Sequence, residues 1–422
     1  MNYPYRQYMY SYPHKTAYHT LEGIRLSDYI SRLSGEKNSL YFHIPFCQYK
    51  CGYCNLFSEA GSSQIRIKAY LDAMERHAGQ IADILPRDAQ FTDLTLGGGT
   101  PLLLSESQLH RVFSIADKYF QFEPGEHFVT VETSPNQTTE AKLSILQDEG
   151  VDRISIGVQS FQEKELERLN RLHSAKSAHQ ALCAIRKKKF ACLNIDIIYG
   201  IPGQTTESLS DSLRQAIAYE PEEIFVYPLY IKPETILYQQ GTEQSPDTLL
   251  LYRQAKDILQ LAGYRQYSMR RFVKTDRVDY VSCGFGSTLS VGCGGRSYLG
   301  NLHFCAPYAV KRKQCQSILT EYIDRKDYLE ITHGYLLSDE QMKRRYVIRH
   351  ILFGRGIDRE EYQKRFDSIP ERDFPQLEEW ACSGYVSLGN EYVSMTDEGF
   401  ALSDFLGPKL IADGREMGWE TE

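Results

Sequence analysis

A short loop with three cysteines constrains this chain more than any other stretch of its sequence. Cys47, Cys51 and Cys54 form a C-x3-C-x2-C pattern directly after the apolar run Tyr41–Phe46. Three thiols this close cannot all pair as disulfides, and a structural zinc site uses four ligands, usually from two separate pairs. Three thiolates on one loop suit three corners of a [4Fe–4S] cluster whose fourth iron stays open to another ligand. The loop therefore predicts such a cluster, and the alternative is three unrelated buried or redox-active thiols.

The composition of the 422-residue chain is that of a globular protein, with 42% hydrophobic and 24% charged residues. Its net charge of −7 argues against nucleic acid or an anionic membrane as the main partner. The sequence has no apolar run long enough to span a membrane, and its first residues lack the features of a signal peptide. We therefore expect a cytoplasmic protein, because that compartment keeps cluster thiols reduced.

Short β-rich runs alternate with helical patterns in the first half of the chain. The expected strands are 40–45, 94–97, 128–132, 153–158, 193–199 and 224–229, and the expected helices are 64–85, 105–120, 138–148, 174–188 and 205–218. Strands separated by helices form right-handed βαβ units with a parallel sheet. The pattern predicts an α/β fold that begins as a partial (β/α)6 barrel of the TIM type.

Changes in this rhythm predict four parts. They are an aromatic-rich arm over 1–37 with a short helix near 21–33, the partial barrel over 38–235, a glycine- and cysteine-containing post-barrel region over 236–335 that completes the substrate site, and a cap domain over 336–422. Helices followed by a Gly-Asn turn between short strands make the last part resemble a winged-helix module. Its acidic balance over 362–422 disfavours contact with nucleic acid.

Several distinctive residues follow or interrupt the predicted strands, where the chemistry of such barrels lies. They are Gly97, Gly98 and Gly99 after the second strand, Glu132 at the third, Gln159 after the fourth and Asp196 within the fifth. Burying a carboxylate in an apolar strand is costly unless the group is hydrogen-bonded or paired. Arg171, twelve residues after Gln159, could bind a ligand carboxylate through two hydrogen bonds. Taken singly, each residue also has an ordinary structural explanation.

Five segments together resemble one known family. In order over Tyr41–Thr205 the chain contains YFHIPFCQYKCGYC, GGGTP, VETSP, SIGVQSF…LNR and NIDIIYGIPGQT. This set resembles the oxygen-independent coproporphyrinogen III oxidase (HemN/HemW-like) family of the radical S-adenosylmethionine (SAM) superfamily. The resemblance implies that Cys47, Cys51 and Cys54 hold a [4Fe–4S] cluster and that SAM binds at its open iron.

The resemblance also implies how SAM is held. The implied contacts are Tyr41 near SAM, Tyr53 on the adenine, the backbone of Gly97, Gly98 and Gly99 at the amino group, Glu132 and Asp196 at the ribose hydroxyls, and Gln159 and Arg171 at the carboxylate. No general acid–base pair is expected beyond the cluster and SAM.

By resemblance, the activity is reductive cleavage of SAM to a 5′-deoxyadenosyl radical that abstracts hydrogen from a tetrapyrrole or related substrate. An electron donor such as flavodoxin or ferredoxin would supply the electron. The sequence departs from two branches of the family: Leu56 replaces a further cysteine of the oxidase, and the His-Asn-x-x-Tyr-Trp motif of the haem chaperones is absent after the barrel. The alternatives are a methyltransferase of the same subfamily and a haem-binding chaperone with little turnover.

The post-barrel region offers three further sets of candidates. Arginine forks suit the propionates of a tetrapyrrole, although a solvated basic loop is the alternative; the candidates are Arg265, Arg270, Arg271 and Arg296. A second cluster is conceivable at Cys283, Cys293, Cys305 and Cys315, although these lack a closely spaced pair and buried thiols are common. Haem ligation is a hypothesis for His43 and His303, which have structural roles as the alternative.

Overall fold

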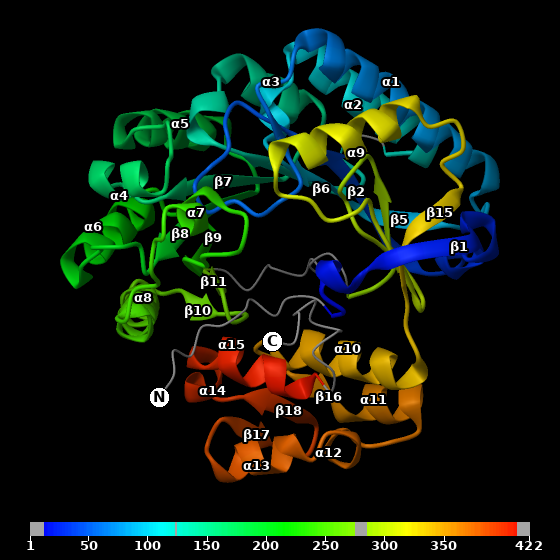
Figure 1. The fold of residues 1–422 in the computed structure, drawn as a ribbon. Helices are drawn as coiled ribbons and strands as arrows, with labels where there is room; N and C mark the ends of the chain where they lie inside the picture. Colours follow the sequence, from blue (N-terminus) through cyan, green and yellow to red (C-terminus); the bar gives the residue numbers. More distant parts are fainter. Residues whose placement is uncertain (1–11, 123–124, 275–284, 412–422) are drawn as a thin grey trace.

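The computed structural model describes residues 12–122, 125–274 and 285–411 (Figure 1). One large sheet runs through it, and six neighbouring strands at its centre are parallel. These are β2 (Lys37–Ile44), β5 (Gln90–Gly98), β6 (Phe128–Thr133), β7 (Arg153–Gln159), β8 (Cys192–Tyr199) and β9 (Glu223–Pro228). They include every strand predicted for the first half of the chain, which confirms the α/β fold.

Helices connect successive strands and cover the outside of the curved sheet (Figure 1). They are α1 (Gln64–Ile84), α2 (Glu106–Phe120), α3 (Glu140–Asp148), α4 (Glu163–Arg168), α5 (Ala175–Lys188) and α6 (Thr206–Ile217). A Ser or Thr side chain caps all but α4 by accepting a hydrogen bond from a backbone N–H of the first turn. Strands β7 and β8 are buried at almost every position, because helices cover one face and the barrel interior the other.

The post-barrel region extends the same sheet at both edges. On one side β12 (Thr288–Val291) pairs in parallel with β2 and continues through β13 (Ser297–Leu299), β14 (Leu302–Phe304) and β15 (Glu330–Leu336). On the other side β9 pairs with β11 (Arg271–Val273), which pairs with β10 (Arg265–Gln266). The remaining elements here are α7 (Ile236–Gln239), α8 (Thr248–Leu261) and α9 (Arg312–Asp324).

The segment predicted as a short helix over 21–33 is a strand followed by two turns. Strand β1 (His19–Arg25) pairs antiparallel with β15, and the 3₁₀ turns η2 (Leu26–Asp28) and η3 (Ile30–Leu33) follow. The helix prediction is wrong because β15 offers an unpaired edge, and hydrogen bonding to it outweighs the weak local preference for a helix.

The C-terminal part has the expected winged-helix-like form. Its helices are α10 (Asp339–Ile351), α11 (Arg359–Phe366), α12 (Pro370–Asp373), α13 (Gln376–Cys382), α14 (Asp397–Ala401) and α15 (Ser403–Leu406), and its small sheet comprises β16 (Ile357–Asp358), β17 (Val386–Leu388) and β18 (Tyr392–Met395). It has its own apolar core, which includes Val347, Leu377 and Trp380. Figure 1 shows it below the barrel, with α10 and α15 nearest the sheet.

Two buried carboxylates hold arginines of the post-barrel region. Glu223 on β9 is fully buried and pairs with Arg153 at 2.9 Å and with Arg271. Asp404 on α15 pairs with Arg270, which joins the C-terminal domain to the barrel. Burial alone would raise the pKa of Glu223, but the guanidiniums of Arg153 and Arg271 lower it below its usual range. Among the described residues, no helix is long and apolar enough to cross a membrane.

We predict that Glu223→Gln destabilises the protein by about 3–5 kcal/mol, because the variant leaves two buried guanidiniums without their carboxylate. Urea unfolding at pH 7 measures the change. The pKa of Glu223 is lowered in the folded state, so its stabilisation is present at neutral pH and is lost as the pH falls below about 4. The difference between wild type and variant should therefore shrink in acid.

Glu398→Gln is the matched control, because the side chains of Glu398 and its partner Arg253 are 57% and 52% exposed. Loss of this exposed ion pair should lower the free energy of unfolding by at most about 1 kcal/mol. Equal effects of the two substitutions would contradict a stabilising role for the buried pairs.

Candidate functional site

The three cysteines of the predicted cluster lie in the loop that follows β2. Cys47 ends β3 (Phe46–Cys47), which pairs with β4 (Glu59–Ala60), and Cys51 and Cys54 lie between these strands. All three are half-buried free thiols. The loop therefore sits at the carboxyl end of a parallel strand, where the barrel fold places chemistry.

Hydrogen bonds from other segments fix the path of this loop. The Gly52 N–H donates to the Leu169 carbonyl at 2.9 Å, and the Gly52 carbonyl accepts from the Leu237 N–H at 2.9 Å. The Asn170 side chain donates to the Lys50 carbonyl at 3.1 Å. A β-carbon on Gly52 would lie 3.1 Å from the Leu169 oxygen, which leaves little space for a side chain. The loop is thus held in shape by contacts from beyond its own residues.

The chemistry of this donor set fits an iron–sulfur cluster. Burial and the two neighbouring thiols raise the pKa of Cys47 to about 12, so a cationic centre is needed to hold three thiolates together. Among the described residues, no three His, Cys, Asp or Glu side chains lie close enough to hold a single metal ion. An iron–sulfur cluster does not require three ligands to converge on one ion, because each cysteine binds a different iron.

Arg171 connects the cysteine loop to the end of β7. Its Nη1 donates to Cys51 Sγ at 3.1 Å, and its Nη2 donates to the Gly157 carbonyl. Its buried Nε has no hydrogen-bond partner among the described residues. A buried donor with no partner is costly, so Nε is available to an additional acceptor.

Gln159 occupies a strained position at the same point. Its φ of +71° lies in the left-handed region, and the pairing of β7 with β8 shifts register between Gly157 and Gln159. A β-carbon on Gly157 would lie 2.6 Å from Gln159 Nε2. Left-handed backbone costs about 1 kcal/mol or more for a residue other than glycine, and such strain is concentrated at functional sites. The structure therefore brings Gln159 and Arg171 together beside Cys51.

The predicted glycine segment packs against protein atoms. A β-carbon on Gly97 would lie 2.7 Å from Tyr41 Oη and 2.8 Å from Glu132 Oε2. Gly98 has a φ of +116°, and its β-carbon would meet the His43 ring at 2.7 Å. One on Gly99 would lie 2.6 Å from a backbone oxygen. Close packing thus explains all three glycines, and a role of their backbone toward SAM stays a prediction.

The two predicted carboxylates lie in the barrel interior, half-buried. Glu132 accepts a hydrogen bond from the Gly98 N–H at 3.1 Å, and Asp196 accepts one from Asn194 Nδ2 at 2.7 Å. Burial raises the pKa of Glu132, and it raises that of Asp196 to about 7 against the hydrogen bond from Asn194. Neither has an ion pair within 4 Å among the described residues. Asp196 lies opposite Gly157 in the sheet, next to the Arg171 contact.

The two predicted tyrosines contact different members of this group of residues. Tyr53 packs on an apolar cluster that contains Leu169, Ile198 and Leu237. Tyr41, on β2, lies against Gly97. All the predicted cluster and SAM residues thus form one connected set at the carboxyl ends of β2 and β5 to β8.

Sequence reasoning predicted a glycine-containing post-barrel region that completes the substrate site, but it did not place those glycines against Tyr41 and His43. A β-carbon on Gly295 would lie 2.9 Å from Tyr41 Cδ1, and one on Gly294 would lie 2.7 Å from His43 Nε2. The density of glycine after residue 284 was the available signal, but only the parallel pairing of β12 with β2 shows what the segment touches.

The post-barrel arginine prediction is wrong for two residues. Arg270 and Arg271 are held in buried ion pairs with Asp404 and Glu223, so structure accounts for both without a ligand. Arg265 is exposed on the edge strand β10. Of the four candidates, Arg296 remains, beside Tyr298.

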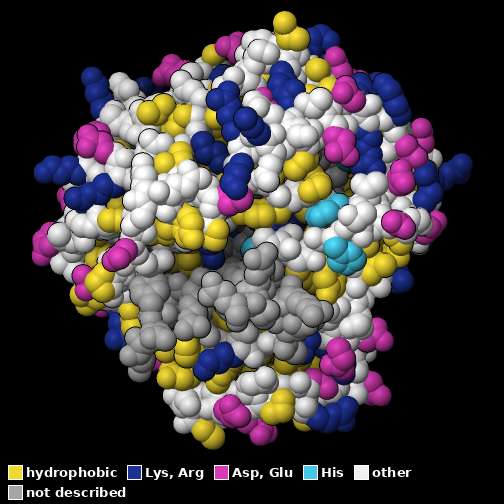
Figure 2. All heavy atoms as spheres, in the orientation of Figure 1, with side chains coloured by type: hydrophobic (Ala, Val, Ile, Leu, Met, Phe, Trp, Pro, Cys, Tyr) yellow, Lys and Arg dark blue, Asp and Glu magenta, His cyan; other side chains and the backbone are white. Residues whose placement is uncertain are grey.

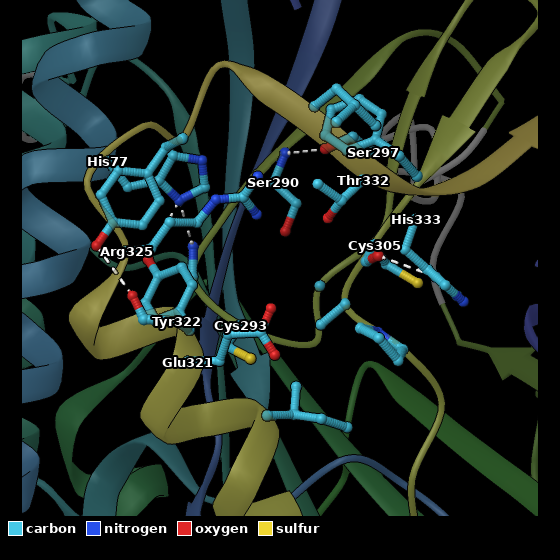
Figure 3. Close-up of a pocket in the computed structure, with 18 of the residues that line it drawn as sticks. His77, Ser290, Cys293, Ser297, Cys305, Glu321, Tyr322, Arg325, Thr332 and His333 are labelled. Carbon is cyan, nitrogen blue, oxygen red and sulfur yellow. Dashed lines mark hydrogen bonds between the residues drawn. The ribbon is translucent and has the colours of Figure 1, made fainter. Parts of the chain in front are cut away.

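The candidate cysteines of a second cluster are only partly described by the structure. Cys283 lies outside the described residues. Cys293 and Cys305 line a cavity of about 320 Å³ between α9 and the β12–β15 edge of the sheet (Figure 3). This cavity shares no lining residue with the predicted cluster and SAM site.

The two histidines considered as haem ligands lie in different surroundings. His43 is hydrogen-bonded through Nε2 to the Phe57 carbonyl, whereas His303 is fully buried.

Comparison with known proteins identifies the family. Residues 41–216 match the radical SAM superfamily. Heme chaperone HemW of Haemophilus influenzae is 31% identical over 62% of this chain and 70% of its own length, and that of Escherichia coli is 30% identical over 86% and 94%. The chain belongs to the HemN/HemW-like family of radical SAM proteins. Membership implies SAM and an iron–sulfur cluster as cofactors.

Two further relatives extend the likeness over the whole chain. Oxygen-independent coproporphyrinogen III oxidase of Pseudomonas aeruginosa is 26% identical over 93% of this chain and 92% of its own. The structure of coproporphyrinogen III oxidase (HemN) of Escherichia coli superposes with a TM-score of 0.79 at 24% identity, covering 96% of each chain. The fold prediction and the predicted resemblance are both confirmed.

We predict that Asp196→Asn stabilises the protein by roughly 1–3 kcal/mol at pH 8 and changes it little near pH 4. The folded protein holds the Asp196 proton more tightly than the unfolded chain does, so stability falls as the pH rises from about 4 through the folded pKa of about 7. The side-chain amide of the Asp196→Asn variant does not titrate, so the variant lacks this dependence of stability on pH. Urea unfolding at both pH values measures it, and a loss of stability at pH 8 would contradict the cost of this buried carboxylate.

Proposed function

We propose that this protein is a radical SAM enzyme that takes a hydrogen atom from a tetrapyrrole or a related substrate. Cys47, Cys51 and Cys54 would hold a [4Fe–4S] cluster, and SAM would bind at its open iron. The observation that carries the proposal is the contact between Arg171 and Cys51 at 3.1 Å, because a guanidinium that could bind a carboxylate lies beside a thiol that would bind a cluster iron.

When bound, the cluster would supply one electron to the SAM sulfonium, whose cleavage would give methionine and a 5′-deoxyadenosyl radical. The chain's own residues then hold and shield the reactants. Arg171 and Gln159 would bind the SAM carboxylate, since Arg171 Nη2 and Gln159 Nε2 both lie beside Gly157 and Arg171 Nε has no hydrogen-bond partner among the described residues. Glu132 and Asp196 would accept hydrogen bonds from the ribose hydroxyls, which replaces the solvation that burial removes. Tyr53 would pack on the adenine, with Tyr41 and the backbone of 97–99 near the amino group.

The fold also supports exclusion of water from the site. The C-terminal domain is joined to the barrel through the buried Arg270–Asp404 pair, and Figure 2 shows apolar side chains on the barrel side that faces this domain. A closed, dry chamber prevents a radical from reacting with solvent. We propose a cytoplasmic location and a small flavodoxin or ferredoxin as the electron donor.

The HemW relatives favour a second candidate, a haem carrier with little turnover. The two differ in chemistry and can be separated in one experiment. Anaerobic reconstitution with iron, sulfide, SAM and dithionite should give about four irons per chain and release 5′-deoxyadenosine. Tight haem binding without 5′-deoxyadenosine would favour the carrier, and S-adenosylhomocysteine beside 5′-deoxyadenosine would indicate a methyltransferase.

We predict that Cys51→Ala abolishes both the cluster's visible absorbance and SAM cleavage, because two cysteines do not hold a cubane. Cys382→Ala is the matched control, since Cys382 is an exposed free thiol of the C-terminal domain. It should retain both properties. Full iron content and SAM cleavage in Cys51→Ala would exclude this loop as the cluster site.

We predict that Asp196→Asn keeps the cluster and binds SAM about tenfold more weakly, as expected for one hydrogen bond to a charged group. Calorimetric titration with SAM measures the affinity. Asp93→Asn is the control, since Asp93 is also half-buried with a raised pKa but lies at the opposite end of its strand, bonded to Ser39. Equal SAM affinity in both variants would leave Asp196 with a purely structural role.

A further inference from the structure

Exposed apolar side chains lie around the cysteine loop. Leu56, two residues after Cys54, is 44% exposed. Leu172, which follows Arg171, is 60% exposed, and Tyr238 on α7 is 54% exposed. A single apolar side chain at a surface needs no explanation, but several around one feature are typical of a surface that another molecule covers. The three positions therefore indicate an interaction surface beside the predicted cluster.

Hydrogen bonds hold the segments that carry these side chains close to the loop. The first of the three side chains belongs to the loop itself. Tyr238 follows Leu237, whose N–H donates to the Gly52 carbonyl at 2.9 Å. Leu172 lies two residues after Asn170, whose side chain donates to a carbonyl of the loop at 3.1 Å. The exposed apolar groups thus come from three segments that the tertiary structure brings to one place.

The start of α9 adds positive charge beside the same loop. Lys311, Arg312 and Lys313 are consecutive and exposed. Helix α9 packs beside β4, the strand that follows the loop, and Lys311 pairs at 3.0 Å with Glu234, two residues before α7. Within the described part of the chain, Arg312 and Lys313 have no ion pair. Two of these three cations are therefore available to a partner.

A further cation comes from the loop itself. The half-buried Lys50 donates through Nζ to the Leu56 carbonyl at 2.9 Å and to Ser58 Oγ at 3.2 Å. The carboxylate that follows, Glu59, is buried and paired with Arg66 at 2.9 Å, so it does not offset this charge at the surface. Figure 2 shows Lys and Arg side chains gathered on the face where Figure 1 places the start of α9. Because the whole chain carries a net charge of −7, this region is a local exception.

We call this surface the docking face, and it comprises the apolar Leu56, Leu172 and Tyr238 and the basic Lys50, Arg312 and Lys313. We propose that the docking face binds a small acidic electron-carrier protein, which delivers its electron to the cluster through the cysteine loop. Apolar groups beside cations are complementary to a carrier that has carboxylates beside an apolar redox centre. The inference rests on the proposed radical SAM function and adds the surface at which the electron enters.

The position of the docking face suits electron delivery. It lies on the loop that contains Cys47, Cys51 and Cys54, whereas the residues predicted to bind SAM line the barrel interior. A carrier on this face would reach the cluster without entering the substrate chamber. With flavodoxin as the carrier, the anionic flavin hydroquinone would lose one electron to become the neutral semiquinone, and the [4Fe–4S]²⁺ cluster would become [4Fe–4S]⁺. No proton or further reactant is needed.

The first test is calorimetric titration of the reconstituted full-length protein with oxidised flavodoxin at low and at high salt. Arg312→Glu/Lys313→Glu should weaken binding about tenfold or more at low salt and change it little at high salt, since salt screens exposed charges. Acidic residues in the first turn of a helix interact favourably with its dipole, so the double variant should fold. Leu172→Ser should weaken binding several-fold at both salt concentrations, because the apolar contact involves no charge.

Lys37→Glu/Arg87→Glu is the matched control, because it changes the net charge equally at the opposite end of the barrel. Lys37 begins β2 and Arg87 precedes β5, and both side chains are exposed. This variant should bind flavodoxin as the wild type does. Release of 5′-deoxyadenosine should fall in Arg312→Glu/Lys313→Glu when reduced flavodoxin is the donor, and it should equal that of the wild type when dithionite, which needs no docking face, is the donor.

Three results would overturn the inference. They are wild-type flavodoxin affinity in Arg312→Glu/Lys313→Glu, equal weakening in the control variant, and binding of anionic phospholipid vesicles in place of flavodoxin. Failure of the proposed function has a different signature. A wild-type protein that releases no 5′-deoxyadenosine with dithionite would lack radical SAM activity, whereas the affinity for flavodoxin tests the docking face separately.

Discussion

The parallel pairing of β2 with β5 on one side and β12 on the other is the constraint on which the site depends. Parallel strands end at one edge, so the cysteine loop after β2 and the glycines at the end of β5 necessarily lie together. The same register sets Tyr41 against both Gly97 and Gly295. Shifting β2 by one residue would turn Tyr41 toward the helices and separate the loop from Arg171. The chemistry is thus positioned by backbone hydrogen bonds far more than by contacts among the site residues.

Charge is distributed unevenly inside the barrel. Around Glu223 the buried charges have partners, since the guanidiniums of Arg153 and Arg271 both pair with its carboxylate. Farther along the interior, Glu132 and Asp196 have hydrogen bonds but, among the described residues, no cation within ion-pair distance, and burial raises the pKa of both. Compensated charges stabilise the fold, whereas uncompensated ones store free energy that a ligand can recover. This contrast is the physical basis on which we propose a ligand-binding role for Glu132 and Asp196.

The sequence was sufficient to predict the parts of the protein in which the local residue pattern and the tertiary structure favour the same element. The six central parallel strands, β2 and β5 to β9, were predicted, and Ser105 caps α2 as expected. The failures have one physical origin, which is long-range pairing. The helix expected near 21–33 became β1 because β15, some 300 residues later, needed a partner. Arg270 and Arg271 resembled a ligand site until Asp404 and Glu223 were seen beside them. Arg345 could not be placed near Arg296 at all, since only the docking of α10 brings the two together.

The edges of the sheet have a consequence for how this protein can be divided. Residues 41–216 match the radical SAM superfamily, yet that stretch ends before β9 and lacks β12. Cut out alone, it would expose the backbone edges of β2 and β8, together with the apolar surface that α8 and α9 now cover, and bare edges of this kind invite aggregation. The segment that matches the superfamily is therefore shorter than the segment that the sheet needs in order to fold. A mutation in the post-barrel strands can disable the cysteine loop through the sheet, with no side chain of its own in the site.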